Sequence, residues 1–81
     1  MTLSEARERA EAARAEHDVG PEWALDDLER RFIQLGGTAR DEPATVRDLL
    51  AWVARFSRGI AWVDLALDDR TGAVVRVERS R

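Results

Sequence analysis

Cysteine is absent from this sequence, which excludes disulfides and thiolate metal sites as sources of stability. Lysine, asparagine and tyrosine are absent too, and all 13 basic residues are arginine. Because the missing residues have AT-rich codons, the composition favours a GC-rich bacterial or phage genome. No apolar run approaches the roughly 20 residues that span a bilayer, and Met1 to Glu16 is too charged for a signal peptide. We therefore expect a cytoplasmic protein without a membrane segment.

Charge is distributed unevenly along the 81 residues, whose net charge is -3. Residues 1–42 carry 11 acidic side chains and 6 arginines, whereas residues 43–81 carry 5 and 7. A basic half beside an acidic half can bind a polyanion or the acidic half of a second copy, although ordinary solvated faces explain it as well. The length predicts one small domain over 1–81, whose thin core makes a partner or a homo-oligomer plausible.

Residues 3–16 are predicted to form a helix, which begins with a capping box made by Thr2 and Glu5. Its inward stripe is nearly all methyl groups and buries little area. The stripe consists of Leu3, Ala6, Ala10 and Ala13. We therefore expect this Ala-rich segment, residues 1–19, to lie at the periphery or to reach a second protomer.

Two further helices are predicted from apolar residues at helical spacing. One runs from Pro21 to about Leu35 and ends at Gly36-Gly37. The other begins at Pro43 or Thr45, after a polar loop over 36–42, and ends near Arg58 with Gly59 as its C-cap. Their apolar faces are Leu25, Leu28, Phe32 and Leu35 in the first, and Val46, Leu49, Leu50, Val53 and Phe56 in the second.

The apolar period then changes to two, which predicts a β-hairpin with strands at 60–67 and 73–79. The turn spans 68–72, where Gly72 supplies a positive φ. The expected fold class is α+β, with three helices followed by a C-terminal antiparallel β-hairpin (αααββ). The predicted core combines the two helical faces with the inner face of the hairpin, which is Val63, Leu65, Val75 and Val77.

Little in the sequence can carry chemistry. His17 is the single histidine and lies in a break between helices, so no nucleophile stands beside a base. Asp68 and Asp69 are adjacent turn residues without the spacing of a calcium loop. Gly36-Gly37 follows a predicted helix and is not a phosphate-binding loop. We expect no catalytic residue, metal or cofactor, and a protein that is not an enzyme.

The outer face and edge of the hairpin form the main candidate interface. Ile60, Trp62, Val74 and Arg76 are predicted to lie on this face, away from the helices. Tryptophan is favoured at interface hot spots, and an unpaired strand edge can recruit another strand. The alternatives are that the helices bury Trp62 or that the two faces of the hairpin are reversed.

A line of arginines is the second candidate. Arg47, Arg55 and Arg58 share one face of the third predicted helix, and Arg70 lies at the tip of the hairpin. The order of elements over 21–81 resembles a winged helix-turn-helix, a family in which the third helix enters the major groove. The resemblance implies that these four arginines contact nucleic acid. This sequence departs from the family in two ways. The loop before its third predicted helix is longer, and the strand that often lies between the first and second helices is missing.

The preferred hypothesis is a small non-enzymatic protein-protein interaction module or regulatory accessory protein. It would use the hairpin edge and outer face, and would pair with its own copy as a homodimer through a joined four-stranded sheet. One alternative is a winged-helix-like DNA-binding regulator. Another is a structural subunit of a larger assembly, such as a phage particle. The identity of the partner does not follow from the sequence.

Overall fold

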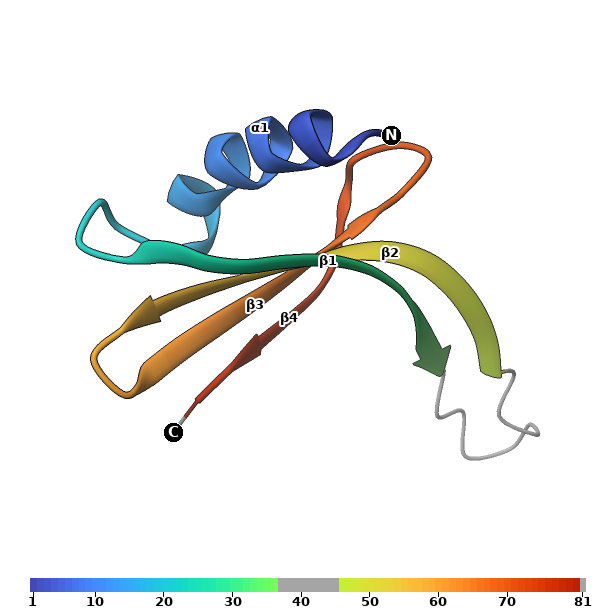
Figure 1. The fold of residues 1–81 in the computed structure, drawn as a ribbon. Coiled ribbons are helices and arrows are strands. Elements are labelled where there is room, and N and C mark those ends of the chain that lie inside the picture. The colour runs from blue at the N-terminus through green and yellow to red at the C-terminus, as the bar shows by residue number, and fades with distance from the viewer. Residues whose placement is uncertain (37–45, 81) are drawn as a thin grey trace.

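In a computed structural model, one helix lies across one face of a four-stranded antiparallel sheet (Figure 1). The structure describes residues 1–36 and 46–80. Each strand pairs with its neighbour in the chain, so the sheet is a meander in the order β1-β2-β3-β4. The elements are α1 (Leu3–Ala13), a 3-10 turn η1 (Arg14–His17), β1 (Ala24–Gly36), β2 (Val46–Arg58), β3 (Ala61–Asp68) and β4 (Val74–Arg79).

The prediction of three helices is wrong, because its second and third helices are the strands β1 and β2. β2 lies inside the sheet, between β1 and β3, and both of its faces are covered. Ala54 and Phe56 pack under α1, while Ala51 and Val53 are buried on the opposite face. A strand buried on both faces has a nearly continuous apolar run instead of an alternating one. Such a run also contains every spacing that a helix requires.

A β-bulge explains the helical spacing of β1. The register shifts between Leu25 and Asp27, so that Leu25 pairs with Phe56 and Leu28 with Ala54. Leu25 and Leu28 therefore both pack against the core under α1, although they are an odd number of positions apart in the chain. Beyond the bulge, successive residues of β1 lie on opposite faces of the sheet, and Phe32, predicted to be core, is 70% exposed. The predicted starts of the third helix, Pro43 and Thr45, lie outside the described residues.

A two-residue turn joins β2 to β3. Arg58 pairs with Ala61, which leaves Gly59 and Ile60 as the turn, and Gly59 has a φ of 61°. A positive φ at the first central residue alone is the pattern of a type II′ turn, whose twist suits a hairpin. The prediction that Gly59 is the C-cap of a helix is therefore wrong, because Gly59 lies in the turn of a hairpin.

The predicted hairpin is confirmed as β3 and β4, with Gly72 at a φ of 76°. A second bulge, between Ala66 and Leu67, changes which residues of β4 point inward. Val74 packs under α1, and Val75 packs on the opposite face. The assignment of Val74 to the outer face and of Val75 to the inner face was therefore wrong.

The first predicted helix and its capping box are confirmed. The Glu5 N–H donates to Thr2 Oγ1 over 3.2 Å, and the Thr2 N–H donates to Glu5 Oε1 over 2.8 Å. Ala6 and Ala10 are fully buried against β2 and β3, whereas Leu3 is 51% exposed. Methyl groups at this contact let the helix axis lie close to the sheet.

Candidate strand-edge interface

β4 is an edge strand of the sheet (Figure 1). One of its sides pairs with β3, from Val63 opposite Arg79 to Leu67 opposite Val74. Within residues 1–36 and 46–80, no strand pairs with its other side. The opposite margin of the hairpin, on β3, is occupied by β2. Of the two edges of the β3–β4 hairpin, one is therefore open in the described residues.

The hydrogen bonds at the end of the ladder show which main-chain groups of β4 point outward. The Ser80 N–H donates to the Trp62 carbonyl over 2.9 Å, and the Trp62 N–H donates to Ser80 Oγ over 2.8 Å. Hydrogen-bonded residues alternate along an antiparallel pair. Glu78, two residues earlier, therefore directs its main-chain groups toward β3. Those of Val77 and Arg79 point away from the sheet and are available to another strand.

The side chains of β4 separate by charge and by face. Arg76 and Glu78 lie on the face opposite α1, since they pair with Ala66 and Asp64. Their side chains form an ion pair of 2.9 Å along the strand. Val77, opposite Leu65, lies on the side of α1 and keeps 36% of its surface exposed. The Arg79 guanidinium donates to the His17 carbonyl, which ties this strand to the end of η1.

A polar cluster lies beside β4 on the same face. The Arg55 guanidinium donates to both carboxylate oxygens of Asp64, over 2.8 and 2.9 Å, and stacks over Trp62 at 4.3 Å from the ring centroid. The hydrogen bonds that Arg55 donates to Asp64 raise the pKa of Arg55 above its ordinary value. Asp64 is only 8% exposed, and the two hydrogen bonds from Arg55 satisfy its charge.

The structure separates the four predicted interface residues. Trp62 and Arg76 lie together on the face opposite α1, Trp62 on β3 and Arg76 on β4. Ile60 is fully exposed at the tip of the β2–β3 turn. Val74 packs into the core under α1. The outer face therefore contains two of the four.

The predicted nucleic-acid residues are not brought into one line. Because β2 is a strand, Arg47 and Arg55 occupy positions on one face of the sheet and Arg58 a position on the other. Arg55 is paired with Asp64, and Arg58 lies 3.8 Å from Glu22. Arg70 is exposed in the β3–β4 turn. The winged-helix resemblance fails, since its third helix is β2.

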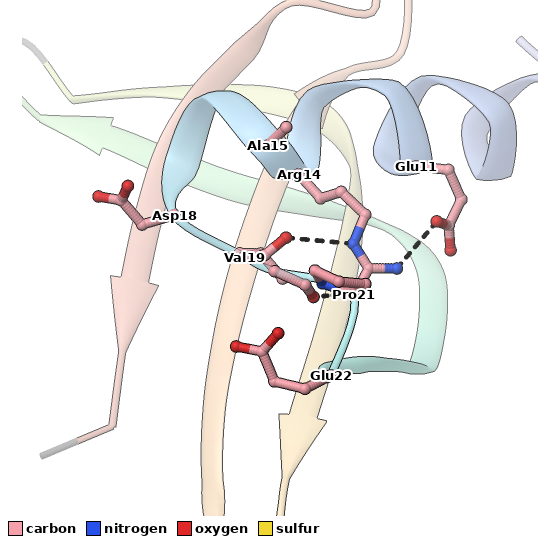
Figure 2. A pocket seen from close by; sticks show the side chains of 8 residues that line it. Glu11, Arg14, Ala15, Asp18, Val19, Pro21 and Glu22 are labelled. Carbon is pink, nitrogen blue, oxygen red and sulfur yellow. Dashed lines mark hydrogen bonds and ion pairs between the residues drawn. The ribbon is translucent and has the colours of Figure 1, made fainter.

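A hollow of about 600 Å³ lies at the end of η1. Figure 2 shows Arg14 reaching across it, with Glu11 on one side and Val19 on the other. Arg14 donates to the carbonyls of Val19, Gly20 and Trp23 and to the Glu11 carboxylate. It also lies 4.7 Å from the centre of the Phe56 ring. These contacts use its donors for structure, so the hollow offers no free cation.

A partly buried carboxylate anchors the β3–β4 turn to the rest of the sheet. Asp69 Oδ1 accepts from Trp52 Nε1 over 2.7 Å and from the Met1 amino group over 3.2 Å. Burial acts to raise the pKa of Asp69, but these hydrogen bonds and the charges of Met1 and Arg30 outweigh it and lower the pKa below its ordinary value. Asp69 is therefore a structural carboxylate, not an acid available for proton transfer.

Sequence reasoning missed the Arg55–Asp64 pair and the outward groups of Val77. The signal for the first was Gly59-Ile60, because a two-residue turn fixes the hairpin register and places Arg55 opposite Asp64. The outward direction of the Val77 main-chain groups follows from which residues of β4 hydrogen-bond to β3, and the sequence does not specify that alternation.

Comparison with protein-family models, curated proteins and solved structures gives no match for this chain. Among residues 1–36 and 46–80, no helix is both long and apolar enough to cross a bilayer. The same residues contain no cluster of three His, Asp or Glu side chains placed to hold a metal ion. The open side of β4 is therefore the feature from which function is argued.

Proposed function

We propose that this protein is a small non-enzymatic interaction module that binds an extended strand along the open side of β4. The observation that carries the proposal is the outward direction of the main-chain groups of Val77 and Arg79, next to a strand pair already in place. A strand added there would gain main-chain hydrogen bonds without any rearrangement of the sheet.

The surroundings of this edge support the same proposal. The strand is tied at one end to η1 through Arg79 and at the other to β3 through the Asp68 N–H, which donates to the Ala73 carbonyl over 2.8 Å. An edge held at both ends loses little conformational freedom when it binds. Alternating Val and charged side chains over 75–78 would add side-chain specificity to the main-chain contacts.

The test uses a synthetic peptide with the sequence of residues 74–80, capped at both ends, added to the isotope-labelled protein. We expect NMR shift changes along β4 and slower exchange of the Val77 and Arg79 amides. Val77→Pro removes an outward N–H while it leaves the bonds to β3 intact, so this variant should fold and lose the peptide.

Glu78→Pro is the matched control, because its N–H faces β3. This variant should lose a ladder hydrogen bond and unfold at lower denaturant concentration. Peptide binding that is absent from a monomeric parent protein, or that is equal in a folded Val77→Pro variant, would show that the β4 edge is not the binding site.

A further inference from the structure

We infer that the strand bound at this edge is β4 of a second copy, so that two chains form a symmetric dimer with one continuous eight-stranded sheet. This inference rests on the proposed function of the β4 edge and names the partner. Symmetric dimers use the same patch on both subunits, so the patch must be complementary to itself. The charges, the main-chain hydrogen bonds and the apolar contact of β4 can each be checked against that requirement.

The charges of β4 meet the requirement when the two-fold axis passes through Val77. Antiparallel pairing about this axis places Arg76 opposite Glu78 of the partner subunit. The same operation places Glu78 opposite the partner's Arg76. Both residues lie on the face away from α1, where their side chains already meet along the strand at 2.9 Å. Opposite charges facing each other across strands stabilise the pairing.

The main-chain groups of β4 are also complementary to themselves when the two-fold axis passes through Val77. Val77 directs its N–H and carbonyl outward, so the two Val77 residues would exchange two hydrogen bonds across the axis. Arg76 and Glu78 then fall in the non-hydrogen-bonded positions, where opposing side chains come closest. One placement of the axis thus satisfies both the hydrogen bonds and the ion pairs.

On the side of α1, the axis brings two partly exposed Val77 side chains together. Each lies beside Leu65, which is fully buried in its own subunit. Dimerisation would therefore extend the core under α1 across the subunit boundary and remove apolar surface from water.

The other edge of the sheet fails the same check. β1 also carries a charge pair, Glu29 and Arg31, 3.6 Å apart. An axis that pairs Glu29 with Arg31 of the partner subunit must pass through Arg30, which places two arginines directly opposite each other. Like charges in that position destabilise strand pairing. The structure therefore favours β4 over β1 as the dimer edge.

The experiment is a pair of charge reversals measured by analytical ultracentrifugation at low salt. Arg76→Glu places two glutamates opposite each other at both ion pairs, and Glu78→Arg places two arginines there. Each variant should self-associate at least about tenfold more weakly than the parent. When the two variants are mixed, every facing pair is again opposite in charge, so a heterodimer should form with near-parent affinity.

Arg70→Glu is the matched control, since it makes the same charge change in the β3–β4 turn away from this edge. It should leave self-association unchanged. The double variant Arg76→Glu/Glu78→Arg restores both pairs within one chain and should dimerise, even if either single variant folds poorly.

Two results would overturn the inference in distinguishable ways. A parent protein that stays monomeric at millimolar concentration but still binds the 74–80 peptide would refute self-pairing and leave the proposed function standing. A dimer that both single reversals leave intact would show that the copies meet through another surface. Failure of peptide binding and of dimerisation together would refute the proposed function itself.

Discussion

At the scale of single residues, Arg14 connects three parts of the structure. It leaves the end of α1 and satisfies three carbonyls of the segment that leads into β1, those of Val19, Gly20 and Trp23. Its guanidinium also stacks on Phe56, a fully buried residue of β2. One side chain thus joins the helix, the connecting segment and the sheet.

Replacement of this residue gives the first prediction. Arg14→Met keeps the aliphatic length but leaves the three carbonyls without their donor, so we expect a loss of about 2–4 kcal/mol in the free energy of unfolding. The stability of Arg14→Lys should fall between those of the parent protein and Arg14→Met, because an ammonium cannot reproduce the planar fork of donors on a guanidinium. Urea denaturation followed by tryptophan fluorescence measures both.

Arg7→Met is the control for this series, since Arg7 is an exposed residue of the same helix. Its cost should stay within about 0.5 kcal/mol. Equal losses for Arg7→Met and Arg14→Met would mean that helix propensity, and not the carbonyl contacts, sets the effect.

Residue-level signals in the sequence predicted the features that depend on neighbours in the chain. The capping box of Thr2 and Glu5 and the positive φ of Gly72 are both confirmed, because each is decided within four residues. The Arg14 contacts were not predictable in this way. They depend on where the chain returns after the left-handed residue Asp18, whose φ is 58°.

At the scale of elements, the contact between α1 and the sheet depends on side chains that are only methyl groups. Ala6 and Ala10 are fully buried between the helix and the strands β2 and β3. Ala10→Leu must push the helix away from the sheet, and we expect it to cost about 1–3 kcal/mol. Ala12→Leu, on the exposed side of the helix, should change stability by less than about 0.5 kcal/mol.

Thermal unfolding followed by circular dichroism compares these two variants. If Ala10→Leu is as stable as the parent, the helix does not lie against the sheet as closely as the structure shows. The result would then favour the sequence-based expectation of a peripheral helix.

The same scale explains why two strands were predicted as helices. β2 is apolar on both faces and β1 contains a bulge, so neither strand shows the alternation that distinguishes a half-buried strand. β3 does alternate in chemistry, with Trp62 and Asp64 on one face and Val63 and Leu65 on the other, and it was predicted correctly. Periodicity therefore identified the strand whose two faces differ and missed the strands whose faces do not.

At the scale of the whole molecule, the sheet follows the chain order without a crossover. The sequence could indicate one domain with a helix at its start and a hairpin at residues 60–79, both of which are present. The sequence could not indicate that one edge of β3 pairs with β2. The candidate site changed accordingly, from a two-sided ribbon with an exposed tryptophan to one edge with a defined hydrogen-bond phase.

The two-residue turn at Gly59 and Ile60 has a practical consequence for measuring this assembly. Ile60 is fully exposed and the chain has no cysteine, so Ile60→Cys provides a unique thiol for a spin label. About the axis at Val77, strand rise and spacing place the two labels about 35–40 Å apart. Pulsed dipolar spectroscopy would detect that distance, whereas an axis at Arg30 of β1 would give a longer one. Arg30 is opposite Trp52, which lies farther from Ile60 along the strands than Leu65 does.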